Sequence, residues 1–562
     1  MKHTLDNISN YFNLPITYNE KKMEVSDNIK TDLELLNAKN NESLYNTLFD
    51  NENECSKETS ELWCKYYTHD KHFIQDTKKM LKKTYTPNLC ELKCWNKIKG
   101  DDEFDDKYNF INFNSLKFLN ESSIVLQILC FYKFISPLIA LLYPIFMMLV
   151  PIIIMKYWNK INIGYYQYFS IIKMLIMNNS VIKLFTDFSL TNWRQTVYLM
   201  FSAFMYVFSI YQNVISCVNF HKNMKNINNY VIEMRMFIKE QIKSMECYEN
   251  NCKNLSTYNP FLIKMNEHKS TLLHGLQIFD TIKTYSWDIH NLSHMGYSMK
   301  MLYYIYYNEQ FHNSIMYSFG FNGYILNIQD IQNNIKRKII NPVNIGKVTR
   351  FSKAYYPVFK KTKHIKNDYS LKTNMIVSGP NASGKTTLIK TTLFNILISQ
   401  QIGYGFYKKA TIKLYKHIHS YLNIPDTSDR DSLFQAEARR CREIIESLTV
   451  NNNDNHFCIF DELYSGTNPY EANASAFAFI KFMLNKKIDF ILTTHFVELC
   501  DNLDNEDEIK NYQMKIDVID DKIIYLYKLI TGVSKYKGGI HVLKQLNYPT
   551  EIIENTKLYL SK

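Results

Sequence analysis

The sequence NMIVSGPNASGKTTLI, at residues 374–389, gives the clearest indication of the fold. It begins with a short apolar run, Met375–Val377, which is typical of a buried β-strand. A loop with two glycines and a lysine follows, and the residues after Thr386 are compatible with a helix. A loop of this kind between a strand and a helix exposes backbone amides that bind phosphate oxygens. A chance match would lack this context, so we predict a nucleoside-triphosphate site here.

The residue types in the loop suit defined roles. The Lys385 ammonium would reach the terminal phosphates, and the Thr386 hydroxyl would bind magnesium. The predicted nucleotide-binding residues of this loop are Gly379, Pro380, Asn381, Ala382, Ser383, Gly384, Lys385, Thr386 and Thr387. The predicted cofactors are therefore ATP and Mg²⁺.

Two later apolar runs end in residues suited to the same chemistry. His456–Phe460 is followed by Asp461 and Glu462. Carboxylates at the carboxyl end of a parallel strand face the phosphates, so Asp461 is expected to hold magnesium and Glu462 to activate the attacking water. A third run, Phe490–Leu492, precedes His495, which could sense or polarise the terminal phosphate. Taken singly, an acidic strand end or one histidine is often structural, so the prediction depends on all three runs converging.

Together the motifs predict an α/β P-loop NTPase domain of the ABC type over residues 346–562. Their order and spacing resemble the ATPase domain of the MutS family. The resemblance rests on SGPN and GKT within residues 378–386, DEL and GT within residues 461–467, and TTHF at residues 493–496. Transporter ATPases instead carry a Leu-Ser-Gly-Gly-Gln signature and usually Asp-Glu-Pro, whereas this chain has Asp-Glu-Leu.

The resemblance implies a dimer and further site residues. The sequence SLFQAE, at residues 432–437, is similar to a family segment that contacts nucleotide across the dimer, which implicates Ser432. By the same resemblance His364 would stack on adenine, although family members more often have Phe or Tyr there. Glu462 and His495 are the predicted catalytic residues, and Thr386 and Asp461 are the predicted metal ligands.

The sequence before the ATPase domain divides into three segments. Residues 1–120 are polar with helix-like spacing of apolar positions, and residues 226–345 are charged and suit lever helices. Between them, residues 121–225 contain two apolar runs, at about 124–155 and 195–220. A helix needs ~20 apolar residues to cross a bilayer. We therefore predict two transmembrane helices before the ATPase, within a mostly helical core and lever region, with two long core helices of a soluble domain as the alternative.

Charge leaves the choice of partner open. The formal charge of +12 comes from 66 basic and 54 acidic residues and would favour polyanions. Residues 336–366 hold ten Lys or Arg and no Asp or Glu, which suits either a solvated connector or a phosphate-facing surface. Residues 1–30 are polar and lack the apolar core of a signal peptide. We expect an intracellular protein whose ATPase lies on the cytosolic or nucleoplasmic side of its membrane.

Two functional hypotheses follow. The N-terminal region has no Phe-x-Glu wedge motif of a mismatch-reading domain, and the apolar pair resembles a MutS-like subgroup with membrane segments. The first hypothesis is a dimeric, ATP-hydrolysing, DNA-binding clamp related to mismatch repair or recombination. The alternative is a membrane-anchored ATPase that acts on a protein partner or the bilayer without mismatch recognition. An inactive scaffold is disfavoured because the lysine, the magnesium ligands and the candidate base are all present.

Overall fold

The fold is taken from a computed structural model of the chain. It describes residues 7–38, 43–51, 53–85, 92–154, 164–178, 193–282, 293–358, 364–422, 424, 432–519, 522–534, 536, 540, 543–544 and 546–560. These residues divide into two compact units. We call them the helical unit, within residues 89–242 and 269–315, and the sheet unit, within residues 6–88, 243–268 and 316–562. Each unit combines residues from several of the predicted sequence segments, whose boundaries stay a prediction.

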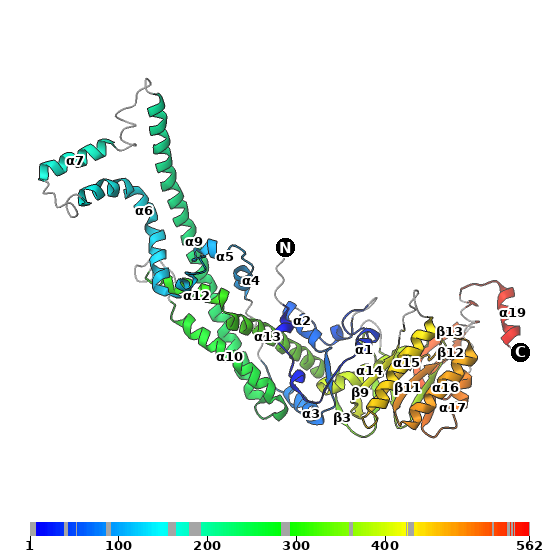
Figure 1. The fold of residues 1–562 in the computed structure, drawn as a ribbon. Coiled ribbons are helices and arrows are strands. Elements are labelled where there is room, and N and C mark those ends of the chain that lie inside the picture. Colours follow the sequence, from blue (N-terminus) through cyan, green and yellow to red (C-terminus); the bar gives the residue numbers. More distant parts are fainter. Residues whose placement is uncertain are drawn as a thin grey trace. The chain divides into compact units, whose positions relative to one another are not determined.

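The helical unit consists mainly of long helices. They are α4 (Lys93–Lys99), α5 (Phe104–Tyr108), α6 (Ser123–Ile153), α7 (Tyr165–Asn178), α9 (Trp193–Cys252), α10 (Asn259–Asp280), α12 (Met295–Tyr307) and α13 (Glu309–Lys336), of which α9, α10 and α13 extend into the sheet unit (Figure 1). Helix α12 packs closely on α6 because Gly296 has no side chain. A Cβ atom at Gly296 would lie 2.2 Å from the Ser123 carbonyl oxygen, so a larger residue there would push the helices apart.

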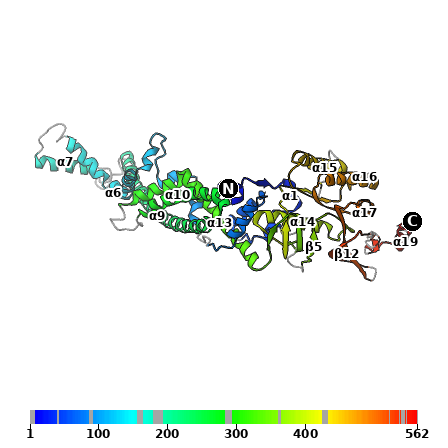
Figure 2. The same cartoon turned by 90° about the horizontal axis from the view of Figure 1, so that it is seen from below.

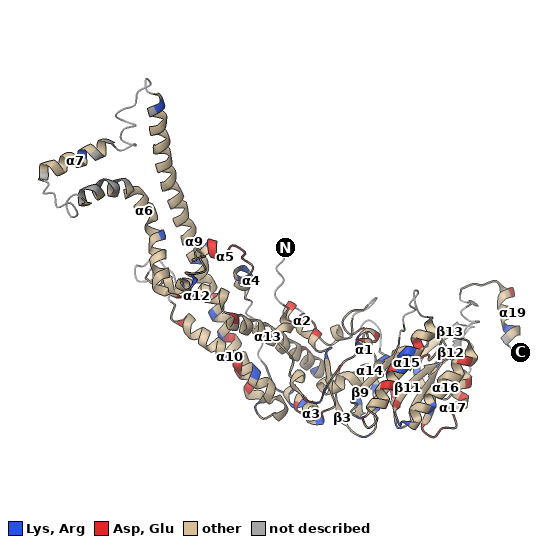
Figure 3. Cartoon of the chain, viewed as in Figure 1, with Lys and Arg blue, Asp and Glu red and all other residues tan. Residues whose placement is uncertain are grey.

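Both apolar runs are helical where the structure describes them. Residues 124–153 lie in α6 and residues 195–220 in α9, while residue 155 lies outside the described residues. Their apolar side chains are largely exposed: the most apolar stretch of α9 is 0% buried and that of α6 is 17% buried. In Figure 3 the upper part of α9 is mostly tan, which means that it carries few acidic or basic residues. A core helix of a soluble protein would be mostly buried.

The sheet unit is organised around a six-stranded sheet with the order β13-β12-β6-β11-β10-β9. All neighbouring pairs are parallel except the antiparallel pair β12 and β13. The strands are β6 (Asn374–Ser378), β9 (His417–Tyr421), β10 (His456–Asp461), β11 (Asp489–Thr494), β12 (Ile509–Ile519) and β13 (Lys522–Thr531). The three apolar runs predicted as strands are β6, β10 and β11, and they are confirmed as neighbours in one parallel sheet.

Helices cover this sheet, as expected for parallel strands that are apolar on both faces. They are α14 (Lys385–Ile402), α15 (Leu433–Val450), α16 (Pro469–Asn485) and α17 (Val497–Leu503), with α19 (Thr550–Leu560) near the end of the chain. Side chains of α15, α16 and α17 share one buried apolar cluster with β10 and β11. In Figure 2, α15 and α16 lie together at one side of the unit.

A second sheet lies beside the first, with the order β5-β4-β8-β3-β7. Its strands are β3 (Asn341–Ile345), β4 (Arg350–Ala354), β5 (Asn367–Ser370), β7 (Tyr404–Gly405) and β8 (Lys409–Ile412). Strand β5 leads directly into β6, so the second sheet fixes the chain just before the phosphate loop.

The N-terminal part of the chain also belongs to the sheet unit. Its elements are β1 (Lys22–Glu24), α1 (Asp27–Asp32), α2 (Glu54–Leu62), β2 (Tyr66–Thr68) and α3 (Lys71–Met80). They pack around the far end of α14, where Gln400 and Gln401 are 0% and 1% exposed. The Gln401 amide donates to the Trp63 and Tyr66 carbonyl oxygens at 2.7 and 2.9 Å, and its oxygen accepts from the Tyr45 hydroxyl at 2.6 Å. A buried amide is stable here because its polar atoms are paired.

Candidate nucleotide-binding site

The phosphate loop connects β6 to α14, as the sequence predicts. Its last glycine, Gly384, caps the helix with φ 96°, a left-handed conformation that favours glycine. A Cβ atom at Gly384 would lie 2.9 Å from the Tyr527 ring. Ala382 is also left-handed, with φ 64°, so the loop holds a strained turn. Strain of this kind is common where a backbone is shaped to bind a ligand.

Lys385 is the first residue of α14 and is almost fully buried, with 5% exposure. Its ammonium donates to the carbonyl oxygens of Gly379 and Pro380 at 2.8 and 3.2 Å. It also lies 3.4 Å from the Glu462 carboxylate. The buried cation is therefore paired within the loop, and it is close enough to the loop backbone to bind phosphate oxygens there.

Asp461 joins the second predicted strand to the phosphate loop. One of its oxygens accepts from the Thr386 hydroxyl at 2.7 Å, and the other accepts from the Thr493 hydroxyl. Oxygen ligands from a hydroxyl and a carboxylate suit Mg²⁺, which is usually held by one or two protein groups together with substrate phosphates. The pair Thr386 and Asp461 therefore fits the predicted metal site.

Glu462 and His495 form a second pair beside Lys385. His495 Nδ1 lies 3.5 Å from the Glu462 carboxylate. The pKa of Glu462 is lowered, first by the hydrogen bond from His495 and then, against the opposing effect of burial, by the Lys385 ammonium. Glu462 is therefore ionised at neutral pH, as a residue that orients or deprotonates water must be.

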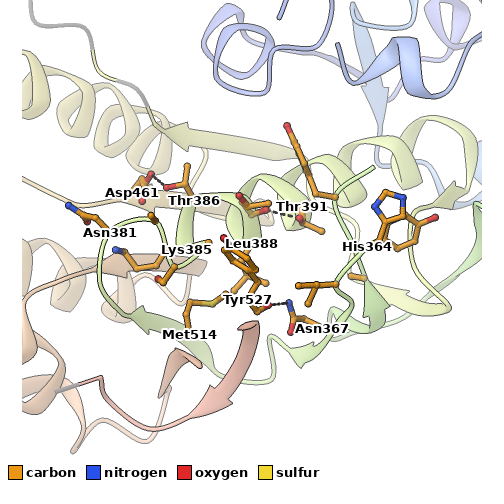
Figure 4. A pocket seen from close by; sticks show the side chains of 18 of the residues that line it. His364, Asn367, Asn381, Lys385, Thr386, Leu388, Thr391, Asp461, Met514 and Tyr527 are labelled. Carbon is orange, nitrogen blue, oxygen red and sulfur yellow. Dashed lines mark hydrogen bonds between the residues drawn. The ribbon is translucent and has the colours of Figure 1, made fainter. Parts of the chain in front are cut away.

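The phosphate loop opens into a cavity of about 860 Å³. In Figure 4, Lys385, Thr386 and Asp461 lie toward one end of this cavity and His364 toward the other. The His364 ring lies 4.7 Å from the Tyr355 ring, and burial together with nearby Lys366 lowers the His364 pKa, which favours the neutral imidazole. A neutral ring in this position could pack against a purine base.

The cavity fits a bound triphosphate in one further respect. The Ser383 hydroxyl is buried and has no hydrogen-bond partner among the described residues. Leaving a buried hydroxyl unpaired costs about 1–3 kcal/mol. A phosphate oxygen bound at the loop would supply the missing acceptor.

The structure brings most of the predicted site residues together. The cavity wall includes Asn381, Ala382, Ser383, Gly384, Lys385, Thr386, Thr387, His364, Asp461 and Glu462. Gly379 and Pro380 supply the carbonyl oxygens that hold Lys385, and His495 contacts Glu462 without lining the cavity itself. Met514 on β12 and Tyr527 on β13 also line the cavity. Sequence reasoning did not select these two, because their approach to the loop depends on how the hairpin of β12 and β13 joins the sheet.

A protein-family model described as MutS domain V matches residues 375–562. The matched region begins in β6 and contains the phosphate loop, Asp461, Glu462 and His495. Residues 375–562 of the chain therefore resemble MutS domain V.

Curated relatives support this resemblance. One is a DNA mismatch repair protein MutS from Bacteroides thetaiotaomicron, 28% identical over 244 residues, which are 41% of this chain and 28% of the relative. A second is a DNA mismatch repair protein MutS from Prochlorococcus marinus, 28% identical over 249 residues, 42% of this chain and 27% of the relative. A third is an Endonuclease MutS2 from Fusobacterium nucleatum, 26% identical over 246 residues, 42% of this chain and 30% of the relative. The chain thus matches less than a third of the length of these relatives.

Ser432, the remaining predicted site residue, is not among the residues that line the cavity. It is the exposed N-cap of α15, where its hydroxyl accepts from the Gln435 amide at 3.3 Å. Its predicted contact with nucleotide therefore requires a second subunit.

Proposed function

We propose that this protein binds and hydrolyses Mg-ATP at the cavity around Lys385. One observation carries the proposal: a buried lysine and a threonine at the start of α14 meet an aspartate and an ionised glutamate at the end of β10, beside one phosphate loop. Magnesium, held by Thr386 and Asp461, would neutralise phosphate charge. The loop amides and Lys385 would hold the terminal phosphates, while Glu462 orients the attacking water and accepts its proton.

His495 has a supporting role in this scheme. His495 Nδ1 lies 3.5 Å from the Glu462 carboxylate oxygen that also faces Lys385, and its hydrogen bond is the first cause of the lowered Glu462 pKa. When Lys385 turns toward a phosphate, His495 remains to hold Glu462 in position. We therefore treat Glu462 as the base and His495 as its orienting partner.

Two variants test this mechanism in the full-length, detergent-purified protein. Lys385→Ala should weaken Mg-ATP binding by about 10- to 100-fold, because charge-assisted contacts to phosphate are lost. Lys372→Ala, at an exposed lysine before β6, is the matched control. Glu462→Gln should keep Mg-ATP binding and slow hydrolysis by about 100-fold or more. Binding is measured by calorimetry and hydrolysis by phosphate release; undiminished turnover in Glu462→Gln would eliminate the assigned base.

We further propose that the ATPase domains form a dimer and that the dimer acts as a DNA clamp related to mismatch repair or recombination. The exposed position of Ser432 and the names of the relatives support this reading. In such a clamp, ATP favours one dimer geometry through contacts made from both subunits, and hydrolysis removes that preference. The basic stretch at residues 336–366, of which residues 359–363 lie outside the described residues, offers contacts to DNA phosphates.

The DNA hypothesis predicts two measurable properties. Duplex or branched DNA should stimulate hydrolysis, and DNA affinity should fall steeply between about 50 and 200 mM salt, because several phosphate contacts release counterions. A salt-independent affinity, or ATPase activity indifferent to every DNA tested, would remove DNA from the proposal while leaving Mg-ATP hydrolysis intact.

The exposed apolar helices motivate a second proposal. We propose that α6 and α9 cross a membrane as a helical pair, with the ATPase on the cytosolic or nucleoplasmic side. They contact each other directly: the Tyr206 hydroxyl donates to the Leu141 carbonyl oxygen at 2.8 Å, and the rings of Phe134 and Phe220 lie 5.4 Å apart. Such contacts satisfy a tyrosine hydroxyl where lipid offers no acceptor.

Extraction tests the membrane proposal directly. The expressed protein should remain in the membrane fraction after washes with high salt and with alkaline carbonate, and detergent should release it. Recovery in the salt-washed soluble fraction would end the proposal. The choice between a DNA clamp and an anchored ATPase acting on another partner is then made by DNA stimulation of the solubilised enzyme.

A further inference from the structure

A buried glutamate ties α15 to the loop that carries the candidate base. Glu437 lies in the second turn of α15 and is 3% exposed. Its carboxylate accepts from the Ser465 amide at 3.1 Å, the Ser465 hydroxyl at 2.8 Å and the Gly466 amide at 3.1 Å. Hydrogen bonds to a buried carboxylate are strong and directional, so Glu437 fixes both residues relative to α15.

The loop held by Glu437 begins at Glu462 and is strained. Glu462 and Tyr464 both have left-handed backbones, with φ 54° and 58°. Non-glycine residues keep such conformations when surrounding contacts enforce them. The Tyr464 amide donates to the Tyr421 hydroxyl at 3.3 Å, and Glu437 holds the following two residues. The loop that follows Glu462 is therefore held partly by Glu437.

The same loop packs directly on the first turn of α15. A Cβ atom at Gly466 would lie 2.8 Å from both Leu433 Cγ and the Phe434 amide nitrogen. Leu433 and Phe434 follow Ser432, the exposed N-cap of this helix. The loop after Glu462 and the tip that presents Ser432 consequently form one packed joint.

The other end of this joint is fixed to the sheet. Arg440, three residues beyond Glu437 and thus on the same face of α15, donates to the Ser420 carbonyl oxygen at 3.1 and 3.0 Å. The Ser420 hydroxyl in turn donates to Asp32 at 2.7 Å. Arg440 therefore anchors the helix to β9. The first turn of α15, between Ser432 and Glu437, packs on the loop that follows Glu462 instead.

We propose that Glu437 is a positioning residue that couples the two contributions of one subunit to a dimer. It places Glu462 in the subunit's own site and, through the first turn of α15, places Ser432 in the partner's site. Movement of the base loop during hydrolysis in one site is thereby transmitted to the other site through Ser432. This inference rests on the proposed dimeric ATPase.

The test uses mixtures of inactive full-length variants. In a mixed dimer, Glu462→Gln damages the variant's own site and Ser432→Ala damages the partner's site. Mixing these two variants should therefore restore hydrolysis, because one site in each mixed dimer retains both an intact Glu462 and an intact Ser432. Glu437→Gln replaces one acceptor oxygen by an amide donor that faces the loop amides. Glu437→Gln should lower hydrolysis at least tenfold. Mixing it with Glu462→Gln or with Ser432→Ala should not restore hydrolysis.

Each outcome is decisive. Restoration by Ser432→Ala would limit Glu437 to its own site, restoration by Glu462→Gln would limit it to the partner's site, and wild-type turnover in Glu437→Gln would eliminate its role; all three overturn the proposal. If Glu462→Gln and Ser432→Ala fail to restore each other, the proposed sharing of sites fails instead. Mg-ATP affinity should stay within about twofold of wild type in Glu437→Gln, which separates positioning from unfolding.

Two further variants guard the result. If Glu437→Gln does not fold, Ser465→Ala replaces it in the test, because it removes only one of the three hydrogen bonds. Ser465→Ala should lower hydrolysis less than Glu437→Gln, and mixing it with Glu462→Gln or with Ser432→Ala should again fail to restore hydrolysis. Glu446→Gln is the control, since Glu446 lies on the same helix with a 60% exposed side chain. It should leave hydrolysis unchanged.

Discussion

Helices α14 and α9 reverse the usual relation between polarity and burial. The far end of α14 buries two glutamines almost completely, whereas the apolar start of α9 leaves Phe201 and Phe204 62% exposed. The α14 glutamines can be buried because strand β2, Trp63 and Tyr415 supply carbonyl oxygens that accept from their amides. The α9 phenylalanines have no such cover among the described residues of the chain. Burial in this protein thus follows the surroundings of each helix, and the surroundings expected for α9 are lipid.

The largest expected effect comes from charging the apolar part of α9. Phe201→Lys combined with Phe204→Lys should move the protein from the membrane to the soluble or aggregated fraction, since each lysine at a bilayer centre costs about 2.5–3.5 kcal/mol. Phe201→Leu with Phe204→Leu is the apolar control and should stay in the membrane fraction. Equal partitioning of the two double variants after carbonate washing would mean that α9 lies outside the bilayer.

The second largest effect is expected from removing a buried polar group of α14. Gln401→Leu removes the amide that pairs with the Trp63 and Tyr66 carbonyl oxygens and leaves the Tyr45 hydroxyl, among the described residues, only its 3.4 Å hydrogen bond to the Trp63 carbonyl oxygen, which should cost about 2–4 kcal/mol of unfolding free energy. Thermal unfolding of the detergent-solubilised protein measures the loss. Gln75→Leu, at an exposed glutamine of α3, should have little effect. A stable Gln401→Leu variant would show that apolar contacts alone hold the N-terminal segment.

Asp32 adds a pH-dependent test of buried polarity. Burial, opposed by the Ser420 hydrogen bond and the Arg440 charge, raises the Asp32 pKa from 3.8 to about 6. A raised carboxyl pKa means that the folded state binds the proton more tightly, so this group's contribution to stability is complete below pH 3.8 and is lost as the pH rises through 6. The loss is at most about 3 kcal/mol.

Asp32→Asn keeps an acceptor for Ser420 and removes the titrating group. The difference in unfolding free energy between Asp32→Asn and wild type should therefore shift in favour of the variant as the pH rises from 4 to 7.5. Chemical denaturation at several pH values measures this shift. A difference that stays constant across the range would contradict the raised pKa.

The smallest effect is expected at a polar pair that the solvent already surrounds. Arg442 and Glu446 of α15 form an ion pair at 2.8 Å, with side chains 79% and 60% exposed. Arg442→Ala should change the unfolding free energy by less than about 1 kcal/mol, because exposed pairs are screened by water and salt. A larger loss would place this surface of α15 in a contact with another subunit.

The sequence predicts the part of the fold around the phosphate loop well, because its signals are local. Apolar runs of three to five residues locate β6, β10 and β11, and a loop, a strand end and a histidine locate Lys385, Asp461 and His495. These residues meet because carboxyl ends of parallel strands lie at one edge of a sheet. Their roles in hydrolysis stay predictions until the variants above are measured.

Other features have no local signal. Gln401 and the Trp63 carbonyl are 338 residues apart in sequence, and no periodicity of either segment indicates that they meet. The apolar run at residues 195–220 in α9 differs, because the sequence shows it directly. Its length, however, suits both a core helix and a membrane span. The structure adds that the side chains of this run are exposed, and the membrane span stays a proposal.

The hydrogen bonds between Gln401 and the N-terminal segment have a consequence for the order in which the chain folds. The N-terminal segment, including buried Tyr45 and Trp63, leaves the ribosome more than 300 residues before α14 does. At about 5–20 residues per second, that interval lasts on the order of 15–60 seconds. During this time the apolar helices emerge while the N-terminal segment has not yet met α14, so the incomplete chain exposes apolar surface of the kind that promotes aggregation.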